Sequence, residues 1–266
     1  MAVIIKNKEE IKLLREGGKR LARILKQVAE KVRPGISTQE LNDYAYQLVK
    51  KGGDEPAFLN YKSRPKDKPY PATLCTSINN EVVHCLPRKD RILKEGDIIS
   101  LDLGLKHKGL FTDHAVTVPV GKISKISQNL IDITKEALLV GIESAKGGKT
   151  VGDIGYAIEK FIGNPEKKRV SNGARKYGMV RVLAGHGVGK KVHEDPYIPN
   201  FGKKGKGQKL IPGMVIALEP MINTGGDNVI NGSDGFGIKT ADGSNSAHFE
   251  HTILITKGDA EVLTKA

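Results

Sequence analysis

The sequence reads Ile98-Ile-Ser-Leu-Asp-Leu103 and then, after the polar stretch Lys106-His-Lys-Gly109, Leu110-Phe-Thr-Asp-His-Ala-Val116. Both flanking runs are rich in the branched and aromatic residues that favour β-strands. Two such runs joined by a short polar stretch with a glycine predict an antiparallel hairpin. This hairpin determines the rest of the interpretation because each of its strands carries an acid inside an apolar run.

The two acids of the hairpin are Asp102 and Asp113. A turn centred between His107 and Lys108 places the two carboxylates directly opposite each other, where like charges destabilise a sheet. Burying an unpaired carboxylate costs several kcal/mol. Neither strand core contains a lysine or arginine. We therefore expect a metal ion between the two aspartates.

Two further acids lie in apolar runs near the end of the chain. Glu219 follows Val215-Ile-Ala-Leu218, and Glu250 lies within Ala247-His-Phe-Glu-His-Thr-Ile-Leu-Ile255. Taken singly, each acid is more typical of the polar face of a half-exposed strand, because acids are rarely buried without a partner. Taken together, four carboxylates balance two divalent cations. A carboxylate-rich site favours Mn, Fe(II), Co or Mg, with Zn as a further candidate.

Three histidines and two cysteines are candidates for the same site. His186 lies in Gly185-His-Gly-Val-Gly189, where glycines permit close backbone approach, and His193 follows seven residues later. A surface turn with two unrelated histidines is the alternative interpretation of this stretch. His84 is, by itself, more typical of a structural histidine. Cys75 and Cys85 are most simply small apolar residues near a pocket.

The periodicity of the whole chain favours an α+β fold. Capping boxes start helices at Ser37 and Thr150, and the glycines 52 and 53 end the first of these two helices. Both halves have the order helix, helix, strands, which hints at an internal duplication. The expected helices cover 7–33, 37–52, 126–146 and 150–162, and the expected strands lie within 73–84, 97–105, 110–120, 214–222, 236–239 and 247–256.

Composition narrows the class of protein. The chain has 266 residues, of which 38% are hydrophobic and 27% are charged, as in ordinary globular proteins. No apolar stretch is long enough for a membrane helix, the first residues do not resemble a signal peptide, and two cysteines cannot build a disulfide framework. We therefore expect a cytoplasmic protein with no membrane partner.

The charge balance predicts a polyanionic partner. Lysine and arginine number 43 against 30 acids, which gives a formal net charge of +13. Such a balance favours nucleic acid or an anionic membrane surface, with solubility or a compositional habit of the organism as the alternative explanation. The basic residues concentrate in two glycine-bearing loops, 163–181 and 200–210.

The order Asp, Asp, His, Glu, Glu, with the motifs around it, resembles the type I methionine aminopeptidase family. The resemblance extends over nearly the whole chain. It rests on Ile4–Gly18, Pro34–Leu41, Ser77–His84, Gly96–Asp102, Gly185–Gly189, Pro212–Met214 and His248–Thr252. It implies one catalytic domain over residues 1–266 with the pita-bread fold, in which two pseudo-symmetric α+β halves surround a curved antiparallel sheet.

The resemblance also implies a role for each candidate residue. Asp102 would bind one of two divalent metal ions (Co, Mn, Fe(II) or Zn), His186 and Glu219 the other, and Asp113 and Glu250 both. The reaction would be removal of the N-terminal methionine from nascent polypeptides with a small second residue. Glu219 would accept a proton, His193 would stabilise the carbonyl oxygen, and His84 would contact the scissile amide. The methionine pocket would be lined by Phe58, Tyr61, Tyr70, Cys75 and Phe236.

Two alternatives remain open from the sequence. One is a pita-bread peptidase of the prolidase or aminopeptidase P type, which shares the metal ligands but usually carries an additional N-terminal domain. The other is a metal-free pita-bread protein that binds nucleic acid or ribosomes, against which the complete ligand set argues. For an aminopeptidase acting on nascent chains, the basic loops 163–181 and 200–210 are candidate contacts to ribosomal RNA.

Overall fold

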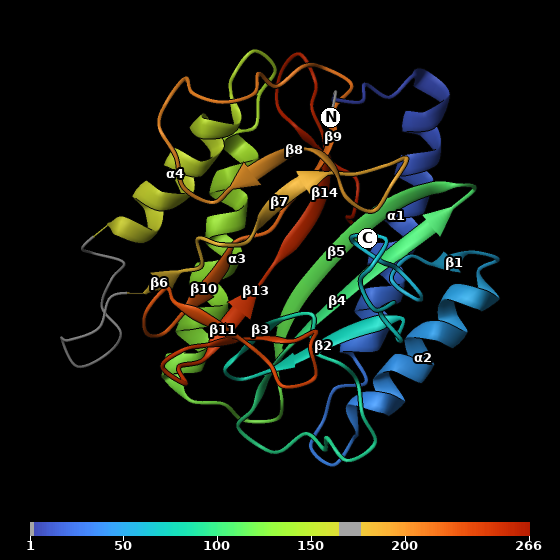
Figure 1. The fold of residues 1–266 in the computed structure, drawn as a ribbon, viewed down its shortest axis with the longest axis vertical. Helices are drawn as coiled ribbons and strands as arrows, with labels where there is room; N and C mark the ends of the chain where they lie inside the picture. Colours follow the sequence, from blue (N-terminus) through green and yellow to red (C-terminus); the bar gives the residue numbers. More distant parts are fainter. Residues whose placement is uncertain (1–2, 165–176) are drawn as a thin grey trace.

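The structure is a computed structural model that describes residues 3–164 and 177–266. In these residues, helices flank a long, twisted antiparallel sheet (Figure 1). The expected α+β architecture is confirmed. The helices are α1 (Lys8–Ala29), α2 (Thr38–Lys51), α3 (Lys125–Ser144) and α4 (Val151–Gly163).

Side-chain caps determine where the helices begin. The predicted capping boxes are confirmed: Ser37 pairs with Glu40 at the start of α2, and Thr150 pairs with Asp153 at the start of α4. Helix α1 ends at Ala29 rather than at the predicted residue 33, because the following amides bond to carbonyls three residues back and Pro34 disfavours helix before it. Helix α3 ends at Ser144 instead of residue 146.

The largest sheet joins strands from both halves of the chain. Its order is β1-β4-β5-β14-β9-β7-β8, with β2 beside β4 and β15 beside β14, and its pairings are antiparallel. The strands are β1 (Glu55–Pro56), β2 (Leu74–Ile78), β4 (Ile98–His107), β5 (Leu110–Pro119), β7 (Ala184–Gly187), β8 (Glu194–Pro199), β9 (Val215–Leu218), β14 (Glu250–Leu254) and β15 (Glu261–Val262).

The remaining strands of the described residues form two small sheets. One has the order β13-β10-β6 and the other β11-β12-β3. Their strands are β3 (Glu81–Val83), β6 (Gly178–Met179), β10 (Met221–Asn223), β11 (Val229–Asn231), β12 (Ile238–Thr240) and β13 (Ser246–His248). Three predicted runs are therefore each divided between two strands: 73–84 at an Asn-Asn turn, 214–222 at Glu219-Pro220, and 247–256 at Phe249.

Each half of the sheet is covered by its own pair of helices (Figure 1). Helices α1 and α2 pack on β2 and β4 through a core that includes Leu21, Leu25, Leu101 and Leu103. Helices α3 and α4 form a second core with strands of the later half, including Ile216 in β9. Because side chains alternate along a strand, the residues between these core positions point away from the helices. That opposite face carries the acids.

The predicted register of the central hairpin is wrong. Asp102 pairs with Ala115, and Asp113 pairs with Gly104, so the two acids are diagonal rather than directly opposed. The physical reason is the turn: Lys108 and Gly109 both have positive φ, as in a two-residue type I′ turn, and the hairpin centre lies between them. Since the pairing moves by two residues, both acids keep the same face of the sheet.

Residues 3–164 and 177–266 contain no helix with the length and apolarity that crossing a lipid bilayer requires. Most of the basic stretch 163–181 lies outside the described residues, which end at 164 and resume at 177. Of its described basic residues, Arg181 is paired with Glu159 at 2.7 Å and Asp227 at 3.5 Å.

Candidate active site

The alternation of side chains brings the sequence-predicted acids to one face of the large sheet. Asp102 and Glu250 both flank Ala115, from opposite sides, in one row across β4, β5 and β14. Asp113 lies two residues from Ala115 on the same strand and therefore on the same face. This convergence joins segments that are more than a hundred residues apart in the sequence.

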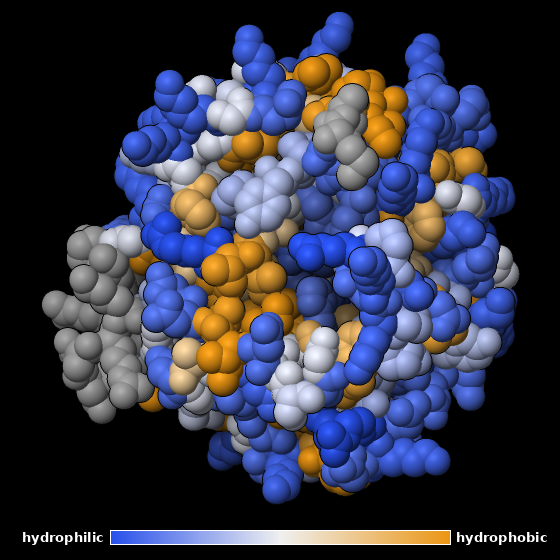
Figure 2. Space-filling model, in the orientation of Figure 1, coloured by the Kyte–Doolittle hydropathy of each residue, from blue (hydrophilic) through white to orange (hydrophobic). Residues whose placement is uncertain are grey.

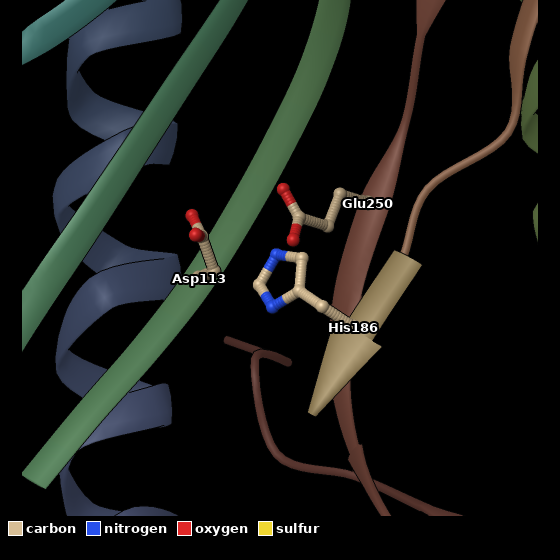
Figure 3. Close-up of side chains that lie close together, drawn as sticks. All are labelled: Asp113, His186 and Glu250. Carbon is tan, nitrogen blue, oxygen red and sulfur yellow. The ribbon is translucent and has the colours of Figure 1, made fainter. Parts of the chain in front are cut away.

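The later strands bring their ligands to the same face. Thr252 pairs with Ala217, which pairs with His186, so His186 shares the face of Glu250. Glu219 lies two residues beyond Ala217. Figure 3 shows Asp113, His186 and Glu250 with their polar ends turned toward one another. One ligand atom from each of these three residues lies within 4.8 Å of the others, a group that could hold a metal ion.

Two histidines contact the carboxylate of Glu219. Nε2 of His186 is 3.6 Å from Oε1, and Nε2 of His248 is 3.5 Å from Oε2. His248 was not singled out from the sequence. The signal that could have found it is its position two residues before Glu250, in a run where polar residues recur between apolar ones.

The electrostatics of the cluster favour a positive charge among the acids. Burial raises the pKa of Asp113 and of Glu219 to about 7, and the pKa values of Asp102 and Glu250 rise further because burial and neighbouring acids both oppose their charge. Oδ1 of Asp102 and Oε1 of Glu250 are buried without a hydrogen-bond partner in the described part of the chain. These orphaned oxygens and this donor set fit divalent cations.

Glycines create the backbone geometry that places His186. A Cβ atom on Gly185 would lie 2.3 Å from the carbonyl oxygen of Ala217, and one on Gly187 would lie 2.2 Å from that of Asp195. Only glycine therefore fits on either side of His186, as the sequence predicted. The predicted strands did not include β7 or β8, because glycine and proline make both segments poor strand candidates.

A cavity of about 380 Å³ opens beside the acids. Tyr70 and Phe236 meet edge to face in its wall with ring centroids 5.6 Å apart, and the Tyr70 hydroxyl donates to the Cys85 carbonyl at 3.2 Å. The lining includes all the residues expected for the methionine pocket and all the expected metal ligands, together with residues that sequence reasoning missed, namely Ser63, Asp67, Lys68 and Gly235.

The remaining two candidate histidines also line this cavity. His84 has a φ of 61°, a left-handed conformation that carries an energetic cost in a residue other than glycine. The ring of His193 lies 4.4 Å from that of His186, so the two are not unrelated surface residues. Although both His84 and His193 are open to solvent, the cavity walls and neighbouring histidines lower their pKa values.

A buried ion pair holds the segment that carries His193. Lys6 Nζ lies 2.6 Å from Oε2 of Glu194, with both side chains almost fully buried. The other oxygen of Glu194 accepts the backbone amides of Lys190 and Lys191 at 2.5 and 2.9 Å. Residues near the start of the described chain therefore fix the loop between β7 and β8.

We expect Lys6→Met to lower the free energy of unfolding by about 3 kcal/mol, because it leaves the Glu194 carboxylate buried without its cation. Denaturant unfolding measures the change. The double variant Lys6→Met/Glu194→Gln should recover part of the loss, since it removes the unpaired charge and keeps an acceptor for the amides. An unchanged unfolding midpoint in the single variant would contradict this account of the pair.

Fold and site together define a class of protein: a candidate metalloenzyme, in which acids and a histidine that could hold a metal ion gather in a cavity with aromatic walls. The sequence profile of metallopeptidase family M24 matches residues 12–257. Methionine aminopeptidase from Aquifex aeolicus is 45% identical, and methionine aminopeptidase 1 from Bacillus subtilis is 39% identical, with at least 99% of each chain covered. The chain belongs to metallopeptidase family M24 and, within it, to the methionine aminopeptidases.

Solved structures agree with this assignment. The crystal structure of methionine aminopeptidase from Rickettsia prowazekii superimposes with a TM-score of 0.91 at 35% identity, covering 99% of this chain and 100% of that one. The prolidase from Pyrococcus furiosus superimposes with a TM-score of 0.71 at 24% identity, and the match covers 66% of its chain. The prolidase likeness extends to the fold alone. The expected pita-bread fold is confirmed, and membership of family M24 implies the use of divalent metal.

Proposed function

We propose that this chain removes the N-terminal methionine from polypeptides whose second residue is small, and that residues 1–266 act as one catalytic domain. The observation that carries the proposal is the cluster of three buried acids and the partly buried Glu219 in a cavity that also has aromatic walls. The cavity suits a thioether, because its aromatic and sulfur-containing walls are apolar and polarizable.

The acids and His186 fit two divalent ions, from among Co, Mn, Fe(II) and Zn. Asp102 would hold one ion, His186 and Glu219 the other, and Asp113 and Glu250 both. When bound, such ions lower the pKa of a water molecule and polarise the scissile carbonyl. The orphaned oxygens support metal binding by Asp102 and Glu250, since each carboxylate has one buried oxygen with no hydrogen-bond partner in the described residues.

The other roles belong to the chain's own side chains. Glu219 accepts the proton of the attacking water, a role that a carboxylate within reach of that water can perform. His193 donates a hydrogen bond to the carbonyl oxygen as negative charge develops there, and His84 contacts the scissile amide. Phe58, Tyr61, Tyr70, Cys75 and Phe236 hold the methionine side chain and exclude water from it.

Peptide specificity tests the proposed reaction. With added Mn²⁺ or Co²⁺, we expect the protein to release methionine from Met-Ala-Ser and to leave Ala-Pro peptides intact. Liquid chromatography of the products measures both reactions. Cleavage of the Ala-Pro peptide alone would support the prolidase-type alternative, and failure to cleave either peptide would support a binding protein without this activity.

We further propose that the enzyme acts in the cytoplasm on nascent chains and contacts ribosomal RNA through the basic loops 163–181 and 200–210. Two free, buried cysteines suit a reducing compartment. In the second loop, Lys203, Lys204, Lys206 and Lys209 are exposed. The loop backbone rests on the start of α4, where the amide of Gly205 donates to Asp153 at 3.0 Å, so the lysines project from a fixed support.

Replacement of these four lysines by glutamate should weaken co-sedimentation with ribosomes at low salt, because fewer positively charged side chains then contact the RNA phosphates. The matched control reverses four exposed lysines of α1 (Lys8, Lys12, Lys19 and Lys26), which changes the net charge equally. Equal sedimentation of the loop variant and the unmodified protein would exclude this surface. Equal weakening by both variants would show that net charge alone governs the contact.

A further inference from the structure

The side chain of Tyr61 makes a direct hydrogen bond to His193. Its hydroxyl oxygen lies 2.6 Å from Nδ1 of the imidazole, and the two rings meet edge to face with centroids 5.2 Å apart. The His193 ring also lies edge to face against the ring of His186, with ring centroids 4.4 Å apart. The imidazole is therefore held between a tyrosine and a candidate metal ligand.

The direction of this bond is coupled to the tautomer of the imidazole. A neutral imidazole carries one N–H, so the nitrogen that accepts a hydrogen bond leaves the proton on the other nitrogen. Burial raises the pKa of Tyr61, which keeps the phenol protonated and able to donate. The nearby Ser63 side chain acts against this rise, as a donor to the phenol oxygen would. That oxygen can accept from Ser63 and still donate its own proton to Nδ1.

The backbone of Tyr61 is fixed by its neighbours. Its carbonyl accepts the amide of Tyr70 at 2.9 Å, and the amide of Asn60 donates to the Tyr70 carbonyl at 2.8 Å. These two bonds close the segment 62–69 into a loop at the rim of the cavity. A hydroxyl on so constrained a residue holds its partner in one orientation, as groups that support a catalytic side chain must.

We propose that Tyr61 is a positioning residue whose hydroxyl donates to Nδ1 of His193 and so fixes the tautomer that carries its proton on Nε2. This inference rests on the proposed function, in which His193 donates a hydrogen bond to the carbonyl oxygen of the peptide. It adds to the expected role of Tyr61 as a wall of the methionine pocket. The aromatic ring contacts substrate, and the hydroxyl prepares the donor.

The variant Tyr61→Phe tests the hydroxyl separately from the ring. We expect kcat for Met-Ala-Ser to fall about tenfold or more, less than the loss from removing an entire oxyanion donor, while KM changes little because the ring remains. A double-mutant cycle adds the decisive comparison: on a His193→Ala background, Tyr61→Phe should have no further effect on kcat. An equal loss on both backgrounds would overturn the proposal.

NMR of the ring nitrogens measures the tautomer of His193 independently of enzyme activity. With only seven histidines in the chain, ¹⁵N spectra of the ring nitrogens can be assigned by comparison with His193→Ala. In the metal-loaded protein we expect Nε2 of His193 to be protonated, and Tyr61→Phe to mix the two tautomers. The control Tyr70→Phe removes another cavity hydroxyl, one that bonds to backbone carbonyls, and should leave the His193 signals unchanged.

The outcomes separate this inference from the proposed function. If the unmodified protein fails to cleave Met-Ala-Ser while the spectra show the Nε2–H tautomer, the assigned reaction is wrong and the hydrogen bond stands. If the protein cleaves the peptide and Tyr61→Phe changes neither the ring signals nor kcat, the positioning role is wrong. Protonation of Nδ1 in the unmodified protein would also refute it.

Discussion

Replacement of Asp113 by alanine is expected to abolish the release of methionine and to lower the metal content of the purified protein. Asp113 lies on the central strand β5, and its carboxylate is one of the three groups that lie within 4.8 Å of one another. As the proposed ligand of both ions, it cannot be lost without weakening both. Product analysis and elemental analysis of the same preparation measure the two effects.

The matched control for this prediction is Asp43→Ala. Asp43 is an exposed aspartate on α2 that accepts a hydrogen bond from Gln39 at 2.7 Å, and we expect its loss to leave activity and metal content unchanged. Asp113→Asn retains the shape of the side chain and should behave like Asp113→Ala, because a neutral amide cannot balance the cations. Normal turnover with normal metal content in either Asp113 variant would refute the bridging role.

Replacement of His193 by alanine is expected to lower kcat by roughly two to four powers of ten and to leave the metal content unchanged. The physical reason is that a hydrogen-bond donor aimed at developing charge acts mainly in the transition state. Steady-state kinetics with Met-Ala-Ser, compared with metal analysis, distinguishes this loss from that of a ligand. An unimpaired kcat, or a loss of metal equal to that in Asp113→Ala, would contradict the assignment.

Local signals in the sequence predicted much of the fold. The capping boxes at Ser37 and Thr150 fixed helix starts because they depend on residues only three apart. The central hairpin was also predicted from residues close together in the sequence, but its register was predicted wrongly. Register depends on the φ values of Lys108 and Gly109, which residue types only suggest.

Long-range features were harder to predict. Strands β7 and β8 exist because Gly185 and Gly187 let neighbouring carbonyls approach, a tertiary requirement that intrinsic strand preference does not report. The contact of His248 with Glu219 depends on the separation of β13 from β14 at Phe249. The bond between Tyr61 and His193 joins residues 132 positions apart and has no sequence signature of its own.

The candidate metal ligands were predictable because their chemistry conflicts with their surroundings. A buried acid requires a counter-charge. Taken together, Asp102, Asp113, Glu219 and Glu250 indicated this requirement without knowledge of the fold, although each acid alone did not. Their common face follows from the alternation of side chains and survived the error in register, because a shift of two residues preserves the face.

The most direct test of the central claim is the hydrolysis of Met-Ala-Ser by chelator-treated protein as Mn²⁺ or Co²⁺ is returned. If the clustered acids bind divalent cations that the reaction needs, the chelator-treated protein releases no methionine, and adding Mn²⁺ or Co²⁺ restores the release. Undiminished cleavage by protein that elemental analysis shows to be free of metal would contradict the claim.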